Sequence, residues 1–218
     1  LDPTGLEAWS IYNMWNSDFI KKYRDYVSTK VKEYKKKEKE FTCEDLALSL
    51  VIDFAAENGL PMSIVNDSGK LDAGSEKYTS LDQYKRDVLK STAAKELQKS
   101  ENTTKVDSLK NIKAGDLILH RNGNNSATHT QVVTSVEKNT ISVAQGNTSW
   151  TAYTPFVSIG SADPSDWNYV GKNINNGKYS LSPNNSYNFV SDLGTHKENA
   201  ERFYNIEARE WNFQDWKK

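Results

Sequence analysis

The amino-acid sequence predicts an α+β domain in which a buried helix packs on an antiparallel sheet. Helical periodicity dominates residues 7–97, and β-branched runs separated by Asn- and Gly-rich turns follow from residue 112. Helices followed by a strand meander are typical of α+β domains rather than of alternating α/β folds.

Residues 7–40 are predicted to form one long N-terminal helix. Aromatic and β-branched residues recur there at three- and four-residue steps: Tyr12, Trp15, Phe19, Tyr23, Tyr26, Val27, Val31 and Tyr34. The stripe fades into the charged segment KVKEYKKKEKE, in which glutamates are interleaved with lysines. We therefore expect a solvated helix end there and no nucleic-acid-binding arm.

The segment FTCEDLALSLVIDFAAENGLP predicts the central, buried helix. Thr42 is a natural N-cap, and Asp45 three residues later can complete a capping box. Gly59 suits the left-handed position after the last turn, and Pro61 blocks continuation. Apolar residues surround most of this helix, which indicates burial on several sides.

The rest of the chain is predicted to hold one more helix and then strands. Residues 62–78 are turn-rich and indicate a surface loop, and a helix follows from a capping box of Ser80 and Gln83 to Leu97. The segments IKAGDLILH, THTQVVTSVE and NTISVAQGN predict a strand meander. With residues 41–150 as the catalytic core, we expect residues 151–218 to be an aromatic-rich C-terminal extension packed on it.

Composition and charge exclude several classes of function. The 28 Lys and Arg residues against 29 Asp and Glu give a net charge of −1, which argues against a nucleic-acid-binding protein. No apolar run approaches the roughly 20 residues that span a bilayer, so no membrane insertion is expected. One Cys and three His make a structural zinc site improbable, and no metal or other cofactor is expected.

The single cysteine, Cys43, falls in the first turn of the central helix, where unpaired N–H groups and the helix dipole favour a thiolate. The neighbouring Glu44 and Asp45 oppose this, because negative charges raise a thiol pKa. A packed, inert cysteine is the other interpretation of this position.

A cysteine nucleophile needs a base that a third group holds in place. His129 opens a predicted strand after the loop RNGNNSA and is the candidate base. Gln145 and Asn147 share one face of the next strand, and either side-chain carbonyl could accept from the imidazole N–H. His120 ends the preceding strand and could lie at the mouth of the same site.

These segments, in this order, resemble the papain-like cell-wall peptidases of the NlpC and CHAP families. The residues that carry the resemblance are TCEDLALSLVIDF, NIKAGDLILH, THTQVVTSVE and ISVAQGN, within residues 40–150. The resemblance implies a papain-like fold whose Cys-bearing helix packs on the sheet, with catalytic Cys43 and His129 oriented by Gln145 or Asn147. It departs in the residues that flank the cysteine and in having Gln145 where those families have an acid.

The substrate-binding side of such a site would include Thr42, His120 and Trp150. Other rings in the last third of the chain, Trp167, Tyr169, Trp211 and Trp216, either line the same cleft or pack in the core, and core packing is the expected role for most of them.

The opening segment LDPTGL resembles the DPxG motif that closes the core of Rhs polymorphic toxins, where the shell is cleaved to free a C-terminal toxin. An ordinary Asp-Pro turn is the alternative. The resemblance makes residues 1–6 a remnant of the cleavage motif and implies three partners: the parent Rhs shell, a secretion apparatus and a cognate immunity protein.

The sequence thus predicts a delivered antibacterial effector that hydrolyses amide bonds in peptidoglycan stem peptides, in the periplasm of the target cell. A protease, deamidase or transglutaminase would use the same residues on a protein substrate, in the target cytoplasm. A non-enzymatic binding domain with a packed Cys43 is the third hypothesis.

Overall fold

A computed structural model describes residues 7–146, 172–181, 187–191 and 206–216, and these form the α+β fold that the sequence predicts. The helices are α1 (Ser17–Lys36), α2 (Cys43–Glu57) and α3 (Leu81–Ser91), with short 3-10 helices η1 (Ala94–Gln98), η2 (Leu109–Asn111) and η5 (Phe213–Asp215). The strands are β1 (Glu40–Phe41), β2 (Ser63–Asn66), β3 (Gly69–Asp72), β4 (Thr103–Lys105), β5 (Leu117–Arg121), β6 (Ala127–Glu137), β7 (Thr140–Gln145), β8 (Lys172–Asn173), β9 (Asn175–Leu181), β10 (Tyr187–Ser191) and β11 (Ile206–Trp211). None of the helices in these ranges is both long and apolar enough to cross a membrane.

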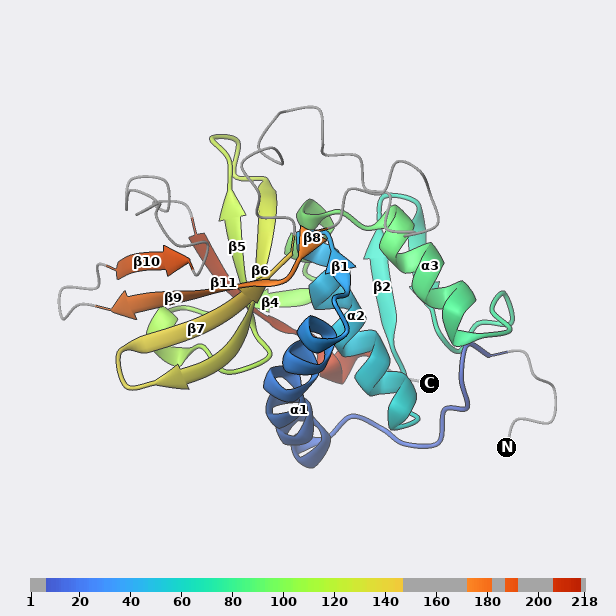
Figure 1. Cartoon of the computed structure of the whole chain (residues 1–218). Helices are drawn as coiled ribbons and strands as arrows, with labels where there is room; N and C mark the ends of the chain where they lie inside the picture. Colours follow the sequence, from blue (N-terminus) through green and yellow to red (C-terminus); the bar gives the residue numbers. More distant parts are fainter. Residues whose placement is uncertain (1–6, 147–171, 182–186, 192–205, 217–218) are drawn as a thin grey trace.

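Seven strands form one antiparallel sheet in the order β10-β9-β7-β6-β5-β11-β4 (Figure 1). The predicted meander is confirmed as β5, β6 and β7, which are neighbours in the sheet. The register of β5 and β6 pairs His120 with His129, and the ladder shifts immediately after this pair. Directly paired residues project from the same face of a sheet, so the register places the two imidazoles side by side.

The described part of residues 151–218 belongs to this sheet. β9 pairs with β7, and β11 lies between β5 and β4. The predicted boundary at residue 150 therefore does not separate one set of strands from another. Trp211 and Trp216 are buried in the core, as expected for most of the late aromatic rings.

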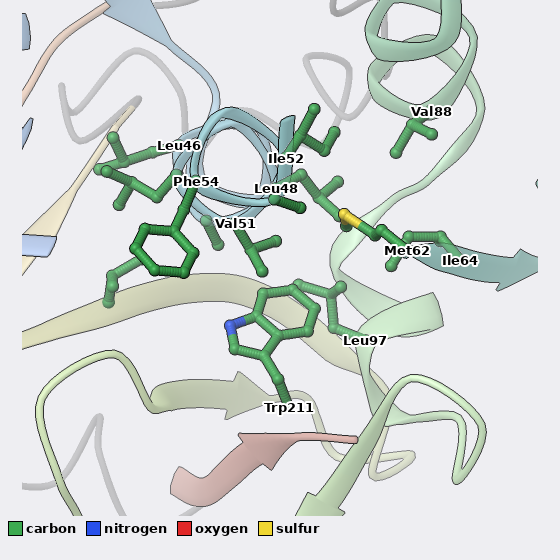
Figure 2. Packing of buried hydrophobic residues seen from close by; sticks show 14 of the residues in the cluster. Leu46, Leu48, Val51, Ile52, Phe54, Met62, Ile64, Val88, Leu97 and Trp211 are labelled. Carbon is green, nitrogen blue, oxygen red and sulfur yellow. The ribbon is translucent and has the colours of Figure 1, made fainter. Parts of the chain in front are cut away.

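Helix α2 is the buried central helix that the sequence predicts. It packs against β6 on one side and α3 on another, and Figure 2 shows apolar side chains on several sides of it. Gly59 follows the helix with φ of +59°, the left-handed position expected for it. The predicted capping box was wrong: Thr42 is the N-cap but its side chain makes no capping hydrogen bond. The start of the helix is instead held by tight packing of Gly146 against the backbone of Thr42.

The single helix predicted over residues 7–40 was too long at both ends. Helix α1 begins only at Ser17, because the Asn16 side chain accepts from two backbone N–H groups of the first turn. The residues before it run across the loop that follows α2, where the indole N–H groups of Trp9 and Trp15 donate to backbone carbonyls. The acceptors are the Leu60 and Pro61 carbonyls, so these two indoles tie the segment before α1 to the loop after α2.

Two smaller predictions also needed correction. The helix predicted to reach Leu97 ends at Ser91, since Thr92 has extended backbone angles and the Glu96 carboxylate accepts from the Ala93 N–H to start η1. The predicted loop over residues 62–78 contains the β2–β3 hairpin. The N-cap role of Ser80 is confirmed, with its hydroxyl accepting from the Gln83 N–H.

Candidate active site

Cys43 is the first residue of α2 and lies against strand β6. Its side chain is buried, and it forms a backbone hydrogen bond from Thr130, the residue that follows His129. The same end of the helix meets the end of β7, where a Cβ on Gly146 would sit 2.6 Å from the Thr42 carbonyl oxygen. Three separate segments of the chain therefore meet at the start of α2.

The thiol lies in a setting that favours its protonated form. The Cys43 sulfur donates to Glu44 Oε2 at 2.8 Å. Burial raises the pKa of Cys43 well above its ordinary value, the negative charge and hydrogen bond of Glu44 raise it further, and the Thr130 hydrogen bond only partly offsets them. Of the two opposing effects that the sequence indicates, the one from the acidic neighbour is present in the structure, and burial adds to it.

The two acidic neighbours of Cys43 are themselves buried. Burial raises the pKa of the Glu44 carboxyl, while its hydrogen bond from the thiol lowers it. Burial, followed by the charge of Glu44, raises the pKa of Asp45 well above its usual range. The first turn of α2 therefore contains two buried carboxyl groups whose pKa values are raised.

His129 is hydrogen-bonded to Gln145, one of the two residues that the sequence offers for orienting its ring. The ring atom Nε2 lies 2.8 Å from Gln145 Oε1. A side-chain carbonyl oxygen can only accept, so Nε2 carries the proton and Nδ1 is left as the basic nitrogen. Burial lowers the pKa of His129, and the hydrogen bond to Gln145 partly restores it, so the resting imidazole is neutral.

His120 lies beside the candidate base. The two imidazole centroids are 5.2 Å apart at an interplanar angle of 86°, and His120 Nε2 lies 3.1 Å from the hydroxyl of Tyr179 on β9. Burial, aided by the electrostatic interaction with His129, lowers the pKa of His120 to about 3, although a hydrogen bond with Gln131 opposes the shift. This second histidine is therefore neutral at physiological pH.

Two polar side chains complete the arrangement. Gln131 Nε2 donates to Gln145 Oε1 at 2.7 Å, and the Tyr179 hydroxyl donates to Gln131 Oε1 at 2.6 Å. Both Gln131 and Tyr179 are buried. A continuous set of hydrogen bonds thus runs from His120 to His129 across strands β5, β9, β6 and β7.

The structure brings most of the predicted site residues to one end of the sheet. Cys43 and Thr42 lie at the start of α2, next to the β6 and β7 residues that carry His129 and Gln145. In the ranges that the structure describes, no hydrogen bond joins the Cys43 sulfur to the His129 ring. The other two predicted residues, Asn147 and Trp150, lie outside the described residues.

Sequence reasoning did not single out Thr130, Gln131, Gly146 or Tyr179 for the site. Gln131 had a usable signal, since it lies two residues after His129 and strand alternation puts both side chains on one face. Tyr179 had none, because its pairing depends on β9 lying next to β7. Within the described part of the chain, no group of three or more His, Cys, Asp and Glu side chains is placed to hold a metal ion.

The chain matches a known protein family. A family model described as "Putative amidase domain" matches residues 13–171, well over half of the chain and including Cys43, His129 and Gln145. No curated protein and no solved structure matches the sequence significantly.

Proposed function

Because the chain belongs to this amidase domain family, whose description suggests amide hydrolysis, we propose that it cleaves amide bonds with Cys43 as nucleophile and His129 as base. One observation carries the assignment. Gln145 fixes the His129 ring, and the very next residue, Thr130, hydrogen-bonds the Cys43 sulfur. The base thus lies one residue from the backbone group that hydrogen-bonds the nucleophile, and its ring is held in a defined tautomer.

The reaction starts from a neutral thiol and a neutral imidazole. As the sulfur attacks the substrate carbonyl, a carbon–sulfur bond forms and the thiol proton passes to His129 Nδ1. The imidazolium then protonates the leaving amine as the carbon–nitrogen bond breaks. Water, deprotonated by His129, hydrolyses the thioester, which releases a carboxylic acid and restores the thiol.

The start of α2 supplies the complementary electrostatics. N–H groups in the first turn of a helix have no intrahelical acceptor and lie at the positive end of the helix dipole. They would donate to the oxyanion that forms next to Cys43. Binding of the substrate also has to move the thiol proton away from Glu44, toward His129.

For the biological role, we propose a delivered antibacterial effector that cuts peptidoglycan stem peptides in the periplasm of the target cell. The LDPTGL motif and the resemblance of residues 40–150 to cell-wall peptidases support this. A toxin of this kind would require a cognate immunity protein, and the parent Rhs shell and a secretion apparatus would deliver it.

The direct test is digestion of purified cell wall and of a synthetic stem peptide. Wild type should release new amine and carboxyl ends, and Cys43→Ala and His129→Gln should release none, while Gly123→Ala, altered in an exposed turn, should remain active. Equal release by Cys43→Ala would overturn cysteine catalysis. Release by none of the proteins would overturn the wall substrate.

Expression in bacteria separates the proposed compartment from the alternative. Toxicity that requires an export signal supports a periplasmic substrate, whereas toxicity without one indicates a protein target in the cytoplasm. Loss of toxicity in Cys43→Ala is expected in either case. Toxicity that survives this substitution would indicate a binding domain instead of an enzyme.

A further inference from the structure

Gln145 is hydrogen-bonded to Gln131, which is in turn hydrogen-bonded to Tyr179, and neither of these two residues belongs to the catalytic pair. We propose that Gln131 and Tyr179 are positioning residues that hold the Gln145 carbonyl toward His129 and so keep the imidazole in the tautomer that the reaction needs. This inference rests on the proposed function, in which His129 accepts the thiol proton at Nδ1. The observation behind it is a chain of contacts of 2.6 to 3.1 Å that leads from His120 to His129.

With the amide orientations of this structure, each hydrogen bond in this chain has one direction. Gln145 Oε1 accepts twice, from His129 Nε2 and from Gln131 Nε2. The Gln131 amide nitrogen is therefore directed at Gln145, and its oxygen accepts from the Tyr179 hydroxyl. Because the Tyr179 proton is used in that bond, His120 Nε2 must be the donor to the Tyr179 oxygen.

Removing one hydrogen-bonding group from this network should reverse the orientation of the neighbouring side-chain amide. Without the Tyr179 hydroxyl, the Gln131 side chain keeps its hydrogen bond with His120 but loses the one from Tyr179, so its amide is freer to turn over and present its oxygen to Gln145. Two carbonyl oxygens cannot share a proton, so Gln145 would turn as well and offer its NH2 group to His129. Nε2 would then have to accept and Nδ1 would carry the proton, which leaves no base for the thiol.

Burial strengthens the influence of Gln131 and Tyr179 on the orientation of Gln145. Gln131 and Tyr179 are almost inaccessible to solvent, with 1% and 0% exposure, and Gln145 is 5% exposed. Water cannot easily replace a lost partner at such sites, so each amide must satisfy its groups from within the network. The Tyr179 ring is held separately by Phe189, at a centroid distance of 4.6 Å, so removing the hydroxyl alone should leave the packing intact.

The test uses Tyr179→Phe and Gln131→Met in the full chain, with Tyr84→Phe as a matched control. Tyr84 is equally buried but lies on α3, where its ring contacts Trp9 and its hydroxyl donates to the Leu71 carbonyl. Nitrogen-15 NMR of the histidine rings gives the tautomer directly, with the His129 signals assigned by their loss in His129→Gln. Kinetics on the stem peptide, or on the substrate that the digestion identifies, give kcat and KM.

Wild-type and Tyr84→Phe protein should show His129 protonated at Nε2, whereas Tyr179→Phe and Gln131→Met should show a substantial Nδ1-protonated population. In these two variants kcat should fall about tenfold, equivalent to about 1.4 kcal/mol, with KM unchanged. An unaltered His129 tautomer in Tyr179→Phe, or a change of tautomer with no change in kcat, overturns the proposal.

The tautomer measurement also separates this proposal from the proposed function. Should no amide substrate be cleaved by the wild type, the function fails, but a tautomer shift in Tyr179→Phe would still establish that Tyr179 positions His129. Conversely, an active enzyme with an unchanged tautomer in both variants retains the function and loses the positioning role. If Gln131→Met fails to fold, Tyr179→Phe alone decides the matter.

Discussion

Gly146 and Thr42 are in direct backbone contact, and this contact joins the end of β7 to the start of the Cys-bearing helix. A Cβ on Gly146 would sit 2.6 Å from the Thr42 carbonyl oxygen, a separation that real Cβ atoms do not show. Since Cys43 follows Thr42 and Gln145 precedes Gly146, the contact sets the distance between the nucleophile and the residue that orients the base.

Gly146→Ala is therefore expected to push the start of α2 away from β7. We expect a loss of about 1–3 kcal/mol in the free energy of unfolding, because the obstacle is backbone that cannot rotate aside. Activity should fall at temperatures where the variant is still folded. Urea denaturation and peptide hydrolysis measure the two effects. Gly123→Ala is the control, since nothing lies within 4 Å of a Cβ there, and equal behaviour of the two variants would contradict the contact.

Glu44→Gln should make the Cys43 thiol more acidic. The substitution removes a negative charge that contributes to the raised pKa of Cys43, although burial would still hold that pKa above its ordinary value. The rate of alkylation by iodoacetamide, measured against pH, should rise at neutral pH. Glu57→Gln, at the other end of α2 and paired with Lys30, should leave the rate unchanged. A slower rate in Glu44→Gln would show that Glu44 promotes ionisation.

Gln145→Glu should raise the pKa of His129. A carboxylate at this position favours the imidazolium, and so opposes the burial that lowers the pKa of His129 in the wild type. The acidic limb of the pH–activity profile should move to higher pH, and NMR titration of the His129 ring should move in the same direction. Gln145→Leu removes the acceptor without adding charge, and a matching upward shift in that variant would rule out the electrostatic explanation.

The histidine pair predicts a loss of stability in acid. The pKa of His120 is lowered from 6.5 to about 3 in the folded chain, so the unfolded state binds the extra proton between these values. The free energy of unfolding should therefore fall as the pH decreases from about 6.5 toward 3. In His120→Gln, which keeps a donor for Tyr179, the decline should be shallower. The free energy of unfolding of both proteins is measured by urea denaturation at several pH values. An equal decline in the two proteins would contradict the lowered pKa of His120.

Local sequence patterns were sufficient for the central helix and the three-stranded meander. A helix with apolar residues on most sides is stable only when it is buried in a core. The end of this helix is marked by Gly59, whose positive φ is a backbone conformation that other residues rarely adopt. The predictions that failed depended on distant partners. Aromatic spacing before Ser17 is consistent with a helix, but the indoles of Trp9 and Trp15 donate to carbonyls beyond α2 instead.

The candidate site divides in the same way. Alternation along a strand and the order of segments pointed to Cys43, His129 and Gln145, because these residues lie within elements that local patterns define. Glu44 was recognised as an unfavourable neighbour of the thiol, but the size of the desolvation effect depends on burial, which packing alone creates. The role of Tyr179 could not be predicted from local patterns, because its partner, Gln131, is 48 residues away in the sequence.

The sequence by itself determined an α+β chain with one cysteine at the start of a buried helix and a histidine at the start of a strand, since periodicity and helix ends are local properties. Only the tertiary structure decided the charge state of that cysteine and the tautomer of that histidine. Both depend on desolvation and on hydrogen bonds between strands brought together by folding, which no local pattern contains.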